Sequence, residues 1–158
     1  GLIALQPLHL YEAYSEWWAR IWSILFAQYA ETPNKQEVNI LERLHKEQTF
    51  AIQQATRVMQ HSGIQLKSYG KRIQYKEHTN ALSYYVVTAI MLIHSQKVLA
   101  WCNSHTNSVI FQFSNNPTSV YQFQQFIRNL IMVSKIDDNT TTNSNTPLYM
   151  TFERFDAI

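Results

Sequence analysis

The sequence is poor in glycine and cysteine. Glycine occurs only at positions 1, 63 and 70 of the 158 residues, so more than half of the chain has none. Phosphate-binding loops and nucleophile elbows need glycine, because the backbone there turns sharply or approaches a ligand where a Cβ would clash. The single cysteine, Cys102, excludes an internal disulfide framework and a cysteine-rich zinc module. We therefore expect none of these four kinds of site.

Charge is also scarce and unevenly placed. Charged residues make up 15% of the chain and hydrophobic residues 46%, which indicates one globular domain over residues 1–158 with ample material for a core. Between Glu77 and Asp137 there is no Asp or Glu, which argues against a sheet-based Mg²⁺ nuclease, because such an enzyme needs clustered carboxylates. The net charge is +2, and most of the excess lies in residues 35–76, a weak basic bias that could attract nucleic acid, anionic lipid or an acidic partner.

The first part of the chain predicts a helical hairpin over residues 8–63. Aromatic and aliphatic residues recur at spacings of three and four over 8–30, which is typical of one helix. Asn34 with Glu37 is close to a capping box and predicts the start of a second helix there. Ser62-Gly63 predicts its end.

The rest of the chain predicts a small antiparallel sheet with further helices. Residues 64–77 fit either a basic β-hairpin or an irregular loop, and 80–94 predict a largely buried helix. Val98–Cys102, Ser108–Ser114 and Leu148–Glu153 predict strands, Pro117 predicts the first turn of another helix, and 136–147 predict a flexible loop. The expected fold is therefore α+β, with the helical hairpin packed against the sheet and the additional helices.

The first helix is the leading candidate for a functional surface. Its aromatic residues cover more of the circumference than one helix partner needs, so the surplus must be covered by the chain's own sheet, by a second protein or by lipid. Its polar side carries more Glu than Arg, which disfavours lipid. The candidate partner-binding residues are Tyr11, Tyr14, Trp17, Trp18, Trp22 and Phe26.

A second candidate is the basic segment 67–76. Cations can neutralise phosphates while tyrosine rings stack on unpaired bases, so this segment could bind RNA or single-stranded DNA. The alternative without a binding function is a solvated hairpin that keeps a sheet edge from pairing with other chains. The candidate residues are Lys67, Tyr69, Lys71, Arg72, Tyr75 and Lys76.

Catalysis is the weakest of the three interpretations. Cys102 and His105 could form a thiolate–imidazole pair, but no acid lies nearby in sequence to orient the histidine. Glu42 and His45 form one Glu-x-x-His unit, and a di-iron site would need two. We expect no metal and no cofactor.

The sequence predicts no secretory signal and no run of about 18 apolar residues that could span a membrane. A soluble intracellular protein is the expectation. The leading hypothesis is a non-catalytic interaction module, a subunit or adaptor that binds a protein partner or a second copy of itself. Binding of nucleic acid is the alternative.

Overall fold

The fold is known from a computed structural model that describes residues 7–31, 39–63, 80–105, 116–134, 136 and 147–150. The elements in chain order are α1 (Pro7–Glu31), α2 (Ile40–Ser62), the π-helical turn η2 (Leu82–Val87), α3 (Thr88–Ile93), α4 (Ser95–His105) and α5 (Pro117–Val133). These ranges contain no strand. The predicted α+β fold with a small antiparallel sheet is therefore wrong, and the protein is helical.

The predicted strand at 98–102 lies inside helix α4. Val98, Trp101 and Cys102 are buried while Leu99 is exposed, and these spacings of three and four place the buried residues on one side of a helix. Of the strand predicted at 148–153, the described residues 148–150 are not in a strand. The predicted strand at 108–114, the hairpin or loop at 64–77 and most of the loop at 136–147 lie outside the described residues.

The helical hairpin is confirmed, with one corrected boundary. Helix α1 matches the predicted range closely, and Gly63 ends α2 in the left-handed conformation (φ 65°). However, α2 begins at Ile40 and not near residue 34, because the side chain of Asn39 accepts a hydrogen bond from the Glu42 N–H (3.2 Å). The predicted start of α5 is also confirmed, since Asn116 caps it through the Ser119 N–H (2.8 Å) and Pro117 follows.

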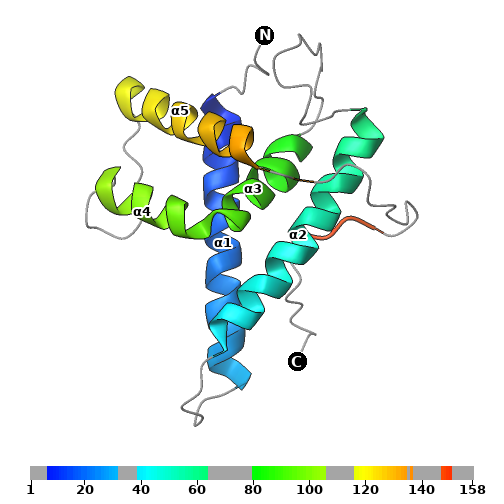
Figure 1. The fold of residues 1–158 in the computed structure, drawn as a ribbon. Coiled ribbons are helices and arrows are strands. Elements are labelled where there is room, and N and C mark those ends of the chain that lie inside the picture. Colours follow the sequence, from blue (N-terminus) through cyan, green and yellow to red (C-terminus); the bar gives the residue numbers. More distant parts are fainter. Residues whose placement is uncertain are drawn as a thin grey trace.

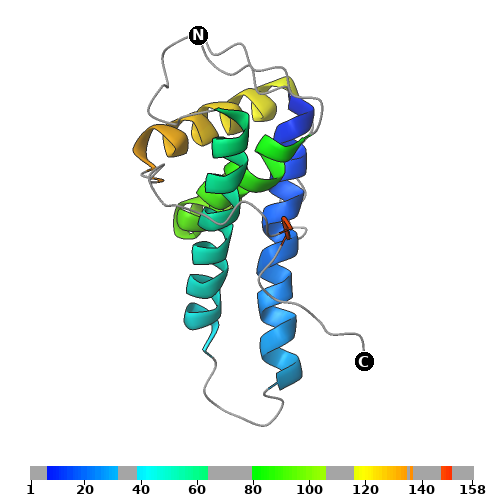
Figure 2. The same ribbon diagram turned by 90° about the vertical axis from the view of Figure 1, so that its right-hand side faces the viewer.

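Helices α1 and α2 run side by side in opposite directions, and the other helices pack only around one end of this pair (Figure 1 and Figure 2). The opposite end, where α1 finishes and α2 starts, extends beyond the other helices. We call residues 22–31 of α1 and 40–46 of α2 the hairpin tip. The elements η2, α3, α4 and α5 cover the hairpin at its other end. Among the described residues, none of these elements covers the tip.

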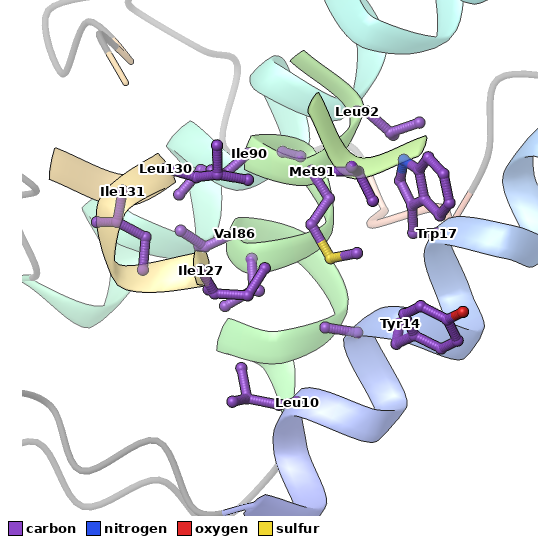
Figure 3. Packing of buried hydrophobic residues seen from close by; sticks show 14 of the residues in the cluster. Leu10, Tyr14, Trp17, Val86, Ile90, Met91, Leu92, Ile127, Leu130 and Ile131 are labelled. Atoms are coloured by element: carbon purple, nitrogen blue, oxygen red, sulfur yellow. The ribbon is translucent and has the colours of Figure 1, made fainter. Parts of the chain in front are cut away.

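The core lies where α3 is enclosed by α1, α2 and α5. Ile90, Met91 and Leu92 are fully buried, and Figure 3 shows their side chains among residues of α1 and α5. The predicted buried helix at 80–94 is thus confirmed, as η2 followed by α3. Small residues allow these helices to approach one another closely, since Ala13 of α1 and Ala55 of α2 are also fully buried.

Two interruptions shape the segment that enters the core. In η2 the Ser83 carbonyl accepts hydrogen bonds from the backbone N–H of Thr88 and also from the Thr88 hydroxyl (3.0 Å). At His94 the chain bends by 93° into α4. The Leu92 carbonyl, freed at this bend, accepts hydrogen bonds from the Ser95 hydroxyl (2.6 Å) and the Gln48 side-chain amide (2.8 Å). Nearby polar side chains therefore donate hydrogen bonds to the backbone carbonyls at both interruptions, as buried backbone groups require.

Candidate functional site: the outer face of α1

The aromatic residues of α1 divide into a buried set and an exposed set. Tyr14, Trp17 and Trp18 are 5%, 0% and 9% exposed and belong to the core. Trp22 and Phe26, toward the hairpin tip, are 38% and 60% exposed. Tyr11 is half-buried. Three of the six predicted partner-binding residues are therefore enclosed by their own chain, and two are exposed at the surface.

The buried aromatic residues stabilise the protein by packing on one another. The Tyr14 ring meets Phe123 of α5 edge to face, with 5.6 Å between the ring centres, and Trp17 packs against Trp18 at 4.6 Å. Such aromatic pairs contribute about 1 kcal/mol beyond the burial of their area. These side chains can reach a partner only if the core opens.

The exposed aromatic residues form a ridge on the other side of the helix. Trp22 and Phe26 stack with 5.8 Å between ring centres and planes 25° apart, and Tyr29, which is 77% exposed, lies one further turn along. At 100° per residue these three side chains point away from the fully buried Trp17 and the buried Ile24. Small residues surround the ridge. We call the whole set the outer face of α1: Ser15, Ala19, Trp22, Ser23, Phe26, Tyr29 and Ala30.

The outer face carries no charged residue. The start of α2 is different, since Leu41 is 78% exposed but is followed by the exposed Glu42 and Lys46, which pair with each other at 2.7 Å. The two helices of the tip are joined by a hydrogen bond from Arg43 Nε to Gln28 Oε1 (3.0 Å). The exposed surface at the start of α2 is thus charged, whereas the outer face of α1 is not.

A buried ionic cluster fixes the position of α1 just before the tip. The Arg20 guanidinium donates to Glu16 on its own helix (Nε–Oε1, 2.9 Å) and to Glu47 of α2 (Nη1–Oε1, 3.2 Å). Its Nη2 lies 3.4 Å from the carbonyl oxygen of Tyr84 in η2. The side chains of Arg20 and Glu47 are 1% and 0% exposed. Burial raises the pKa of Glu16, and the adjacent Arg20 opposes this shift.

The sequence analysis missed this cluster, because Arg20 reads there as part of a polar helix face. The signal that could have pointed to it is the spacing of four between Glu16 and Arg20, which places opposite charges on one side of a helix. Nothing in the sequence indicates that Glu47 lies opposite them. The cluster joins α1, α2 and η2 and so sets the direction in which the tip extends.

The structure does not support a nucleophilic site at Cys102. Burial raises the pKa of its thiol, so the reactive thiolate is disfavoured at neutral pH, and the sulfur lies 3.8 Å from the Tyr14 hydroxyl. The His105 side chain is exposed and stacks on Trp101, with Nδ1 2.8 Å from the Ser104 hydroxyl. Burial and packing thus give the thiol the environment of a core residue.

The six residues of the predicted nucleic-acid site, positions 67–76, lie outside the described residues, and that prediction stays open. Among the side chains that the structure describes, no three His, Cys, Asp or Glu residues gather in a way that could hold a metal ion. In the same part of the chain no single helix is long and apolar enough to cross a membrane. Only the bent pair Leu82–Ile93 and Ser95–His105, taken together, has sufficient length and apolar composition.

Comparison of this chain with protein-family models, with curated proteins and with solved structures finds no match in any of the three. The class of the protein is therefore defined by its fold alone. It is a helical protein with a long hairpin and a core built at one end of it.

Proposed function

We propose that this protein is an interaction module that binds a protein partner through the outer face of α1. The observation that carries this proposal is the exposure of three neighbouring aromatic side chains, Trp22, Phe26 and Tyr29, on a helix surface without charge. Aromatic residues at a protein surface are typical of binding sites, because they bury a large area at a small cost in side-chain entropy.

The size of the ridge supports a specific contact. An aromatic side chain has about 200 Å² to bury, so exposures of 38%, 60% and 77% leave about 350 Å² of the three rings in water. Patches of that size on a protein surface are often functional. A lipid surface is disfavoured as the partner, since an interfacial helix carries Lys or Arg beside its apolar face and the outer face has neither.

The buried cluster at Arg20 supports the same proposal. A docking surface on a projecting arm is effective only if the arm is held in one direction, because ordering it on binding would reduce the affinity. The hydrogen bonds of Arg20 to Glu16 and Glu47 lie immediately before the ridge and join α1 to the neighbouring helix.

Photocrosslinking tests the proposal. A photoreactive phenylalanine analogue is placed at Phe26 in the full chain, and in a second variant at Tyr121 of α5. The two side chains are equally exposed, at 60% each, so position 121 is a matched control for accidental collision. Irradiation in the cells that make the protein should give a discrete protein adduct from position 26 that is absent from position 121.

The identity of the adduct is read by mass spectrometry, and the adduct must disappear when Trp22 is also replaced by alanine. A defined adduct with this dependence supports docking on the outer face. If position 26 gives no more adduct than position 121, or if the adduct does not respond to Trp22→Ala, the proposal is wrong.

A further inference from the structure

We infer that the partner on the outer face is a second copy of this chain, packed antiparallel along α1. This inference rests on the proposed docking function and names its partner. It begins from a pattern on the exposed side of the helix. Five residues follow one another at spacings of four and three, the repeat of a helix–helix seam: Ser15, Ala19, Trp22, Phe26 and Tyr29.

The seam is complementary to itself when two copies run in opposite directions. In antiparallel helix pairs the two kinds of seam position face each other across the interface. One such register places Trp22 of one copy opposite Ala19 of the other, and Phe26 opposite Ser15. Trp22 and Phe26 then each meet a small residue, an alternation that packs two surfaces without voids or overlap, while Tyr29 lies opposite Glu12.

Charge favours the antiparallel direction. In a parallel pair the Glu12 side chains of the two copies, one seam step before Ser15, would lie beside each other, and like charges in such positions are destabilising. In the antiparallel register Glu12 faces the level of Tyr29, so the two Glu12 residues are 17 positions apart, about 25 Å along the axis. This exceeds the distance of about 8 Å over which salt screens exposed charges.

The absence of charge on the seam between residues 15 and 29 also favours a second copy over a highly charged partner. A charged surface docked there would lose its water without gaining an opposite charge. The outer face of another copy has the same uncharged character, so neither side pays this cost. The two surfaces match in polarity as well as in shape.

The area sets the strength of the contact. The three aromatic rings of each copy contribute about 350 Å², hence about 700 Å² for the pair, and the small residues between them add to this. The rings alone remain below the lower limit of stable interfaces, about 1,200 Å², and in the range of weak, transient contacts. We therefore expect a reversible dimer with a dissociation constant in the micromolar range and a monomer that keeps its own core.

Sedimentation velocity of the full chain, over about two decades of concentration around the micromolar range, tests the dimer. Ala19→Trp overfills the layer opposite Trp22 and should weaken the dimer at least about tenfold. The exchange Ala19→Trp with Trp22→Ala restores one large and one small residue to that layer and should recover the affinity. Tyr121→Ala removes a ring that is as exposed as Phe26 but lies on α5, and it should have no effect.

A disulfide measurement checks the register independently of the affinity. Chains carrying Ala19→Cys are mixed with chains carrying Trp22→Cys, and the mixture should crosslink faster than either variant alone. The native Cys102 is 4% exposed, so it does not compete for oxidation. Circular dichroism confirms that each variant keeps the helical fold, and Phe26→Lys replaces Ala19→Trp if the latter does not fold.

Three results would overturn this inference. The first is a chain that stays monomeric at all concentrations tested. The second is a dimer whose affinity is the same with Ala19→Trp and with Phe26→Lys as without them. The third is an exchange of positions 19 and 22 that fails to restore the affinity that Ala19→Trp removes. A monomer whose position 26 still crosslinks to a different protein removes the second copy and leaves the proposed docking function standing. A monomer without any specific adduct at that position removes both.

Discussion

The buried cluster around Arg20 gives a prediction whose size follows from the structure. Arg20→Met removes the hydrogen bonds to Glu16 and Glu47 and the approach to the Tyr84 carbonyl, and it takes away the cation that lies between two carboxylates in a largely buried place. Removing one partner of a buried ion pair costs 3–5 kcal/mol. We expect about 4 kcal/mol less free energy of unfolding, since the Glu47 side chain is completely buried.

Three further variants separate the cluster from a general effect of substitution. Glu47→Gln keeps an oxygen for Arg20 and leaves the Glu16 pair in place, so it should cost only about 1–2 kcal/mol. Arg20→Met with Glu47→Leu replaces both groups with apolar side chains and should cost less than Arg20→Met alone. Lys46→Ala breaks a pair that is about half exposed and should change stability by less than about 0.5 kcal/mol.

Urea unfolding followed by circular dichroism measures all four variants. The reasoning is refuted if Arg20→Met costs as little as Lys46→Ala, because the cluster would then behave as a surface ion pair. It is also refuted if Arg20→Met with Glu47→Leu costs more than Arg20→Met alone, because removal of the second buried charge should relieve part of the loss.

Three other predictions concern separate parts of the chain. Burial and the nearby Lys97 lower the pKa of His94 below the 6.5 of an ordinary histidine, so the unfolded chain binds its proton more tightly. The stability that neutral His94 provides is complete above pH 6.5 and is lost as the pH falls through the pKa of the folded state. The variant His94→Gln should therefore make the urea midpoint less dependent on pH in that window. Gly63→Ala should lower the free energy of unfolding by about 1 kcal/mol in the same assay. The whole cost comes from the left-handed backbone at φ 65°, since the added Cβ meets no neighbour. If segment 67–76 binds single-stranded nucleic acid, fluorescence titration should show affinity that falls steeply with salt and drops on replacement of Lys71 and Arg72; salt-independent binding would contradict it.

The features that could be predicted from the sequence are those with a local cause. Helix α5 starts at Pro117 after a capping Asn116, and α2 ends at Gly63, because these residues act on the backbone beside them. The start of α2 was predicted wrongly, since Asn34 and Asn39 are each followed by Glu three residues later. The second of these pairs caps α2 in the structure, and the first lies outside the described residues.

The fold class could not be predicted because short apolar runs are ambiguous. Residues 98–102 fit a buried strand and a helix equally well by length, and the neighbouring helices decide between them by covering Val98 and Trp101 while leaving Leu99 exposed. The same limit applies to the aromatic helix. Its pattern revealed an excess of apolar surface, but only the packing of η2 and α3 determines that Trp17 is enclosed and Phe26 is not.

The most direct test of the account compares two alanine variants of α1 in urea unfolding, at a protein concentration too low for association. Trp17→Ala removes a fully buried side chain and should cost about 3–5 kcal/mol. Phe26→Ala removes a ring that is 60% exposed and should cost less than about 1 kcal/mol. Equal losses for the two variants would mean that the chain encloses Phe26 itself, and the outer face of α1 would then not be a surface on which a partner can bind.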